Sequence, residues 1–210
     1  MKKQELPSQI FVSGTDTGIG KTVVSAMLTA GLDASYWKPI QSGLDAETDT
    51  EFVKRVTGVD ESRLLPEKFR LYEPLSPHAS AAIDGVHIDM SDFDIPDYTT
   101  DRLVVEGAGG LMVPMNEKDM IIDLIKHLDL PVLLVARSSL GTLNHTFLSL
   151  EALRRRNIPV VGVIMNGMKN ESNRKAIEYY GDVEVIAELE ELTELNVDQL
   201  LSQFNTFFKS

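Results

Sequence analysis

The sequence predicts an α/β fold, a doubly wound, mostly parallel β-sheet flanked by helices. Three observations carry this prediction. Four short aliphatic runs lack the alternation of a half-exposed strand, as expected of strands buried on both faces, at residues 10–13, 103–106, 132–136 and 160–166. A helical pattern follows each run, at residues 21–32, 120–128, 144–156 and 172–180. This regular alternation is typical of parallel sheets.

Weaker patterns complete the prediction. Residues 35–38 and 183–187 are further strand candidates, and residues 197–208 form a candidate closing helix. Residues 45–100 are irregular because prolines interrupt any long element, so we expect one helix near residues 49–57 and otherwise loops. The length of 210 residues suits a single domain spanning residues 1–210.

Composition excludes several classes of function. The net charge of −12 argues against nucleic acid or an anionic membrane surface as a partner, since both require an excess of Lys and Arg. The chain has no cysteine, which excludes disulfides, thiolate catalysis and thiolate-bound metals. No apolar run is long enough for a signal peptide or a membrane span. We therefore expect a soluble cytoplasmic protein.

A glycine-rich segment, GTDTGIGKT at residues 14–22, lies between the first predicted strand and the helix after it. A phosphate-binding loop requires this context, because backbone N–H groups and the helix N-terminus together attract anions. In such a loop Lys21 neutralises the β- and γ-phosphates, and the Thr22 hydroxyl binds Mg²⁺. Five residues separate Gly14 from Gly20, so this is a variant of the common spacing. A glycine-rich turn that only packs well is the alternative.

Two acidic residues are candidate ligands of Mg²⁺, which prefers hard oxygen atoms. Glu106 ends a predicted strand and precedes the segment GAGG, a turn at the sheet edge where doubly wound folds bind ligands. Asp49 is surrounded by other acidic residues, so a solvated charged surface remains the alternative for it.

Lys38 closes a short predicted strand, so the chain leaves the sheet at the same edge as the phosphate loop. There a lysine is placed to stabilise charge on a transferring phosphoryl group or an anionic substrate; a surface lysine is the alternative. The segment LGTLN at residues 140–144 precedes a helix with Thr142 as its predicted N-cap. Its N–H groups suit a carboxylate, and an ordinary helix cap is the alternative. His78 and His145 lack partners at metal-ligand spacing, which favours structural roles.

Six segments, taken in order, resemble those of the dethiobiotin synthetase family, whose members are ATP-dependent carboxylases with a P-loop NTPase type of fold. They are GTDTGIGKT (14–22), KPIQSG (38–43), TDT (48–50), SPHASAA (76–82), VEGAGG (105–110) and LGTLNHT (140–146). The resemblance implies 7,8-diaminopelargonic acid as the substrate, with CO₂ captured as a carbamate on one amine. ATP then phosphorylates the carbamate, and the second amine closes the ring.

The resemblance also implies roles for individual residues. Lys38 and Lys21 would be catalytic, and Thr22, Asp49 and Glu106 would hold Mg²⁺. Contacts to ATP are implied for Gly18, Ile19, Gly20, Lys21, Thr22, Val23, Asp49, Glu106, Gly107, Ala108, Gly109 and, at the adenine base, Asn166. Contacts to the substrate are implied for Thr17, Ser42, Leu143 and Asn144, the last two acting in the partner's site of a homodimer.

Two other functions compete with this one. An ATP-dependent amide synthase of the cobyrinic acid type would be expected to carry a glutaminase domain with a catalytic cysteine, which this chain lacks. A nucleotide-switch ATPase of the partitioning type usually has an additional lysine early in the loop, where this chain has Thr15 and Asp16. The sequence therefore favours the synthetase.

Overall fold

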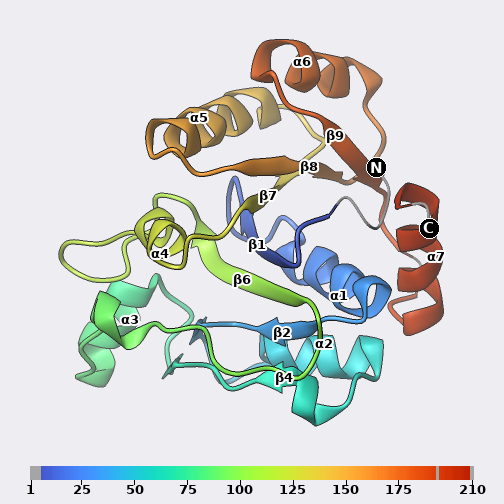
Figure 1. Cartoon of the computed structure of the whole chain (residues 1–210). Helices are drawn as coiled ribbons and strands as arrows, with labels where there is room; N and C mark the ends of the chain where they lie inside the picture. The colour runs from blue at the N-terminus through green and yellow to red at the C-terminus, as the bar shows by residue number, and fades with distance from the viewer. Residues whose placement is uncertain (1–5, 193, 209–210) are drawn as a thin grey trace.

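A seven-stranded sheet forms the centre of the molecule in the computed structural model, which describes residues 6–192 and 194–208 (Figure 1). Its strand order is β4-β2-β6-β1-β7-β8-β9, and every neighbouring pair in it is parallel. The strands are β1 (Gln9–Gly14), β2 (Ser35–Trp37), β4 (Leu64–Leu65), β6 (Leu103–Gly110), β7 (Val132–Arg137), β8 (Val160–Asn166) and β9 (Val185–Leu189). The predicted fold class is confirmed.

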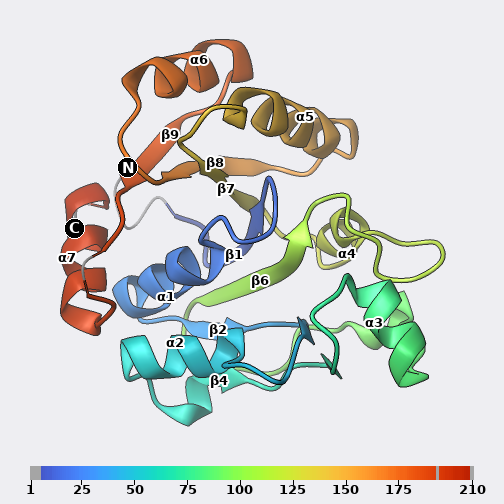
Figure 2. The same ribbon diagram turned by 180° about the vertical axis from the view of Figure 1, so that it is seen from behind.

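Helices cover both faces of this sheet, as the two opposite views show (Figures 1 and 2). One apolar core holds buried residues of α1 (Lys21–Leu32), α2 (Asp49–Thr57) and α7 (Val197–Phe207). The other holds buried residues of α3 (Pro77–Asp84), α4 (Ile121–His127), α5 (Thr142–Arg155) and α6 (Glu171–Gly181). Both faces of the strands are therefore buried, which explains their continuous apolar runs.

Successive strand residues enter opposite cores, because side chains alternate along a strand. Tyr36 and Val104 are partners in β2 and β6, and both belong to the core beneath α1. Trp37 and Val105 are the next pair, and both belong to the opposite core. Continuing the alternation by one residue places Glu106 on the face covered by α1.

The predicted elements agree with the structure except at their ends. The helices at residues 21–32 and 49–57 begin and end as predicted. β6 does not end at Glu106 but continues to Gly110, because Gly110 still pairs with Gly14 of β1 after an irregularity in the register, where Gly109 takes a positive φ of 66°. The expected turn after Glu106 was therefore wrong.

The region between residues 45 and 100 holds more structure than its prolines indicated. It contains the helix α3 and two short helical turns, η2 (Glu61–Arg63) and η3 (Met90–Asp92). It also contains β5 (Phe69–Leu71), which pairs in parallel with β3 (Ile40–Ser42) to form a second, two-stranded sheet. Pro77 begins α3 rather than preventing it, because the first turn of a helix needs no N–H from that residue.

None of the helices in the described residues is long and apolar enough to cross a membrane.

Candidate nucleotide and metal site

A cavity of about 620 Å³ opens at the carboxyl ends of β2 and β6, beside the loop that joins β1 to α1. Ligands bind at this edge of doubly wound sheets, where loops leave the strands in opposite directions. The sequence-predicted residues that line the cavity are Thr17, Gly18, Gly20, Lys21, Thr22, Val23, Lys38, Ser42, Asp49, Glu106, Ala108 and Gly109. Segments far apart in the chain therefore meet around one cavity.

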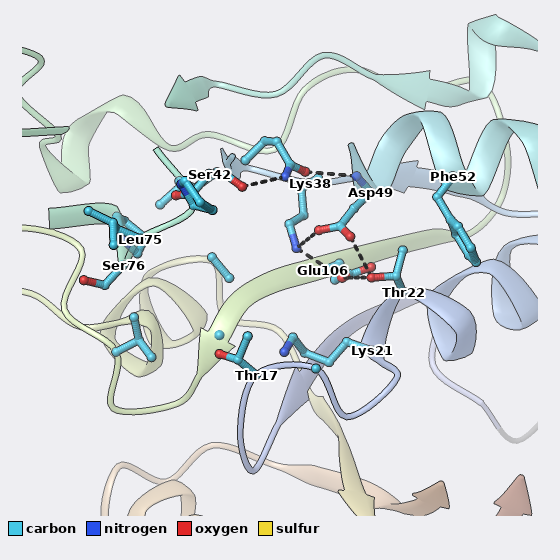
Figure 3. A pocket seen from close by; sticks show the side chains of 18 of the residues that line it. Thr17, Lys21, Thr22, Lys38, Ser42, Asp49, Phe52, Leu75, Ser76 and Glu106 are labelled. Carbon is cyan, nitrogen blue, oxygen red and sulfur yellow. Dashed lines mark hydrogen bonds and ion pairs between the residues drawn. The ribbon is translucent and has the colours of Figure 1, made fainter. Parts of the chain in front are cut away.

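Four polar side chains converge in this cavity (Figure 3). Lys38 Nζ lies 2.6 Å from Asp49 Oδ2 and 3.1 Å from Glu106 Oε1. Thr22 Oγ1 lies 2.8 Å from Asp49 Oδ1 and 3.0 Å from Glu106 Oε1. Lys38 Nζ also donates a hydrogen bond of 3.2 Å to the carbonyl oxygen of Gly107. We call these four side chains the charged cluster.

Each member of the charged cluster lies in a regular element or directly beside one. Lys38 directly follows β2, and Glu106 lies in β6, the neighbouring strand. Thr22 is in the first turn of α1, and Asp49 is the first residue of α2. The N-terminus of α2 is held by a capping box between Thr48 and Glu51. Regular secondary structure therefore sets the positions of all four groups.

Burial and charge oppose one another at Lys38, whose side chain is only 4% exposed. Burial by itself lowers the pKa of Lys38, but the charges of Glu106 and Asp49 outweigh burial and raise this pKa above its ordinary value. Burial by itself raises the pKa of Asp49, but Lys38 outweighs it, and the pKa lies below its ordinary value. Lys38 is therefore a fixed cation in this site, and Asp49 a fixed anion.

The second lysine of the cavity behaves differently. Lys21 Nζ donates a hydrogen bond of 3.0 Å to the carbonyl oxygen of Asp16 in the phosphate loop. Burial, followed by the charge of Lys38, lowers the pKa of Lys21. A cation that is only partly neutralised by its own chain is suited to an anionic ligand such as a phosphate group.

The charged cluster has the donor atoms that Mg²⁺ prefers. One hydroxyl oxygen and two carboxylates meet at Thr22, whose single hydroxyl hydrogen serves only one of the two carboxylate oxygens at a time. Among the described residues no group of three or more His, Asp or Glu side chains suits a metal. Mg²⁺ commonly takes one or two carboxylates and completes its shell with water and substrate phosphates. Thr22, Asp49 and Glu106 therefore fit a nucleotide-bound Mg²⁺.

Three contacts hold the phosphate loop from outside. The N–H of Thr15 donates to the carbonyl oxygen of Val135 at 3.0 Å, and Arg137 forms an ion pair of 2.8 Å with Asp16. Asn166 Nδ2 donates to the carbonyl oxygen of Ile19 at 2.8 Å. Gly20 follows in the left-handed region with φ of 93°, and a Cβ there would lie 2.1 Å from Asn166 Nδ2. The close approach of Asn166 is possible only because residue 20 is glycine.

The remaining predicted residues lie outside the lining of this cavity. Ile19 and Gly107 contribute carbonyl oxygens to the contacts with Asn166 and Lys38. Leu143 and Asn144 lie in the first turn of α5 and are not among the described residues that line the cavity. His78 contacts Ser76 at 3.0 Å, and His145 lines a separate cavity of about 310 Å³.

The turn before α5 corrects one prediction. Gly141, with φ of 93°, is the N-cap residue, and Thr142 is already the first helical residue. Thr142 is buried, and its hydroxyl lies 3.4 Å from that of Thr146. The prediction of Thr142 as the N-cap was wrong, because a glycine in the left-handed conformation begins the helix one residue earlier.

Sequence reasoning missed several residues around the cavity. Phe52 lies three residues after Asp49 in α2 and also lines the cavity. Residues three apart share one face of a helix, so this spacing was the signal that could have identified Phe52. Gln41 accepts a hydrogen bond of 3.1 Å from the N–H of Asp49 and so holds the start of α2. Leu75 and Ser76 also line the cavity, close to Ser42 (Figure 3). Gln41 and Ser76 lie in the segments KPIQSG and SPHASAA, but no individual role was predicted for either, and no pattern in the sequence marks Leu75.

The parallel sheet and the loop between β1 and α1 define a P-loop nucleotide-binding protein, and a family model described as an AAA domain matches residues 8–199. A Bradyrhizobium diazoefficiens protein named ATP-dependent dethiobiotin synthetase is 46% identical over 96% of each chain. A Brucella ovis protein of the same name is 49% identical over 94% of this chain and 92% of its own. The chain belongs to the ATP-dependent dethiobiotin synthetase family and is an ATP-dependent ligase.

Solved structures that resemble this one are more distant. A ParA family ATPase from Chlorobium tepidum has a TM-score of 0.53 and 14% identity, covering 97% of this chain and 95% of its own. A plasmid partition protein from Borrelia burgdorferi has a TM-score of 0.54 and 14% identity, covering 96% and 97%. These similarities show the fold alone. The relatives at 46–49% identity favour the synthetase over the partitioning ATPase and the amide synthase.

Proposed function

We propose that this protein catalyses the ATP-dependent carboxylation and ring closure of 7,8-diaminopelargonic acid, giving dethiobiotin, ADP and phosphate. One observation carries the proposal: a buried lysine, two carboxylates and a hydroxyl meet beside the phosphate loop, with Lys38 Nζ 2.6 Å from Asp49 Oδ2. The relatives named dethiobiotin synthetases support this choice of substrate.

The proposed reaction forms three bonds in sequence. An amine nitrogen of the substrate bonds to the carbon of CO₂ and loses a proton, which gives a carbamate. A carbamate oxygen attacks the γ-phosphorus of ATP, and ADP leaves with the electron pair of the broken P–O bond. The second amine attacks the carbonyl carbon, loses a proton and displaces phosphate as the ring closes.

The two lysines supply positive charge rather than a base in this scheme. Lys38 remains protonated, because Glu106 and Asp49 raise its pKa, and its N–H groups are placed to stabilise the carbamate as it gains a phosphoryl group. Lys21 binds the β- and γ-phosphates, replacing its present contact with the Asp16 carbonyl. Positioned cations are the main requirement of phosphoryl transfer.

Two hydroxyl residues are assigned to the substrate end of the cavity. Thr17 lies in the phosphate loop, and Ser42 lies at the end of β3. Ser42 Oγ is buried and has no hydrogen-bond partner among the described residues. A buried hydroxyl without a partner is costly, so a substrate group that bonds to Ser42 would remove this cost. We assign Thr17 and Ser42 to binding of the carbamate-bearing end of the substrate.

Mg²⁺ in this proposal is held by Thr22 Oγ1, Asp49 and Glu106 together with oxygen atoms of the nucleotide. When bound it would neutralise charge on the phosphate groups during transfer. Lys38 contacts both carboxylates, so the same acids that hold the ion also fix the lysine beside the reacting phosphoryl group.

Nucleotide contacts are assigned to two backbone segments and one side chain. Residues 18–23 and 106–109 would surround the phosphates with N–H groups; all of them except Ile19 and Gly107 line the cavity, and Thr22 contacts Glu106. Asn166 ends β8 and already uses Nδ2 to hold the loop at Ile19. Its amide oxygen therefore accepts a hydrogen bond from the amino group of adenine in this proposal.

The carboxylate of the substrate is assigned to the turn at the start of α5 in a second copy of the chain. Leu143 and Asn144 do not line the cavity of their own chain, whereas Leu140 beside them is 99% exposed. A homodimer in which this turn reaches the partner's cavity gives both observations a common explanation.

Phosphate release tests the proposal directly. Purified protein with 7,8-diaminopelargonic acid, bicarbonate, Mg²⁺ and ATP should release phosphate continuously, and mass spectrometry should detect dethiobiotin in the same reaction. Omission of the diamine is the control and should reduce phosphate release to a low background. Equal release with and without the diamine would disprove the proposed function.

A further inference from the structure

Tyr36 is a buried tyrosine that contacts Glu106 of the charged cluster from outside the cavity. It lies in β2, is fully buried, and does not line the cavity. Its hydroxyl donates a hydrogen bond of 3.0 Å to Glu106 Oε2. The roles proposed above for Lys38, Thr22, Asp49 and Glu106 do not involve it.

The sheet register explains how Tyr36 reaches Glu106. Tyr36 is paired with Val104 of β6, and Glu106 lies two residues further along the same strand. Residues two apart share a face of the sheet, and a diagonal neighbour at this distance is within reach of a long aromatic side chain. The tyrosine hydroxyl therefore meets the carboxylate from the sheet side.

The two oxygen atoms of Glu106 have different partners. Oε1 contacts Lys38 and Thr22, both of which line the cavity, whereas Oε2 receives the hydroxyl of Tyr36. The last bond of a glutamate side chain rotates over a broad range when nothing restrains the carboxylate. Glu106 is only 1% exposed, so water is not freely available to replace Tyr36 as a donor.

We propose that Tyr36 is a positioning residue, whose hydroxyl holds Glu106 Oε2 so that Oε1 is presented to Thr22, Lys38 and the Mg²⁺ of the nucleotide. This inference rests on the magnesium site of the proposed function. Side chains that orient metal ligands in this way change metal affinity by about 10- to 100-fold when they are removed.

Metal binding by the Tyr36→Phe variant tests the inference without relying on turnover. Mn²⁺ replaces Mg²⁺ as a probe, and its binding in the presence of ADP is measured by electron paramagnetic resonance. We expect Mn²⁺ affinity to fall about tenfold, while ADP affinity in EDTA stays unchanged. Tyr98→Phe is the matched control, because the Tyr98 hydroxyl accepts a 2.8 Å hydrogen bond from Gln9 and contacts no member of the charged cluster.

Two shape-matched replacements separate the hydrogen bond from packing. 4-Methylphenylalanine at position 36 fills the volume of the hydroxyl without a donor and should bind Mn²⁺ as weakly as Tyr36→Phe. 4-Aminophenylalanine keeps a donor at the same place and should restore most of the affinity. Equal Mn²⁺ affinity for these two replacements would overturn the inference, whatever their melting temperatures.

Glu106→Gln distinguishes failure of this inference from failure of the proposed function. Strong loss of Mn²⁺ binding in Glu106→Gln, with wild-type binding in Tyr36→Phe, would overturn the role of Tyr36 alone. Unchanged Mn²⁺ binding in Glu106→Gln would reject the magnesium site and the role of Tyr36 together.

Discussion

The charged cluster and the turn at the start of α5 are two regions to which the family resemblance assigns ligand contacts, but their structures differ. In the cluster, Lys38 and Glu106 are buried, and both have polar partners within 3.1 Å. In the turn, Leu140 is 99% exposed, and neither Leu143 nor Asn144 lines the main cavity. The polar groups of the charged cluster are paired within their own chain, whereas the turn lies away from the main cavity of its own chain.

This difference has a physical basis. Charges taken out of water must be paired, so a buried site carries its partners within the same fold. An exposed leucine imposes no such requirement, and a single one is common on protein surfaces. We therefore expect changes in the charged cluster to affect chemistry and folding of each chain, and changes in the turn to affect association between chains.

Lys38→Met should produce the largest effect. Removing this cation eliminates a preorganised donor to the reacting group, so kcat should fall about 100- to 1,000-fold, measured as phosphate release with saturating diamine. ATP affinity should change little, because Lys21 and the loop backbone remain. Lys175→Met, at an exposed lysine of α6, is the control and should leave kcat unchanged. Unaltered turnover in Lys38→Met would remove this residue from the mechanism.

Gly20→Ala, in the phosphate loop beside the charged cluster, and Gly141→Ala, in the turn before α5, form a matched pair. Both glycines are helix N-caps with φ of 93°, so alanine adds about 1 kcal/mol of backbone strain at either position. A Cβ at Gly20 also meets Asn166 at 2.1 Å, whereas a Cβ at Gly141 meets nothing within 4 Å. Gly20→Ala should therefore reduce the free energy of unfolding in urea by at least about 1 kcal/mol more, through loss of the Asn166 hydrogen bond. Equal losses would contradict the crowding at Gly20.

Asp49 should make folding stability depend on pH. Its pKa is lower in the folded protein than in the unfolded chain, so the unfolded state binds a proton first as the pH falls. The stabilisation that results from the lowered pKa of Asp49 is present above about pH 4 and is lost as the pH falls through the pKa of the folded state. Urea unfolding should show a larger loss between about pH 6 and about pH 3 for wild type than for Asp49→Asn. Parallel curves for the two proteins would show that the ion pair with Lys38 does not shift this pKa.

Leu140→Asp should have the smallest effect on the isolated chain. The side chain is exposed, so the free energy of unfolding should change by less than about 0.5 kcal/mol. If the turn reaches a second copy, sedimentation should show weaker self-association than in wild type. Met168→Asp changes another highly exposed apolar residue and should leave association unchanged. Identical sedimentation of wild type and Leu140→Asp would argue against a dimer formed through this turn.

Sequence patterns predicted the fold well where local physics decides it. The helices at residues 21–32 and 49–57 match to the residue, because a glycine precedes one and a threonine with a glutamate three residues later caps the other. Predictions failed where one type of residue is compatible with two different local structures. Pro77 starts a helix instead of breaking one, and Gly141 takes the N-cap position that Thr142 was expected to fill.

The sequence predicted which residues belong to the site better than it predicted the contacts between them. Lys38 and Asp49 were recognisable as candidates, although solvated alternatives remained open for both. Their burial and mutual contact depend on β2, β6 and α2 meeting at one sheet edge. No individual role was predicted for Tyr36 or for Gln41 of the KPIQSG segment, because each acts only on a residue that the fold brings beside it.

By itself the sequence determined the parallel sheet and the phosphate loop, because buried strands and a glycine-rich helix start each produce a pattern within a short stretch of the chain. Only the tertiary structure decided how the charged cluster is assembled. Lys38 and Glu106 lie 68 residues apart in the chain, and Thr22 and Asp49 lie 27 apart. Contacts at such separations follow from strand order and register, which no single segment of the chain contains.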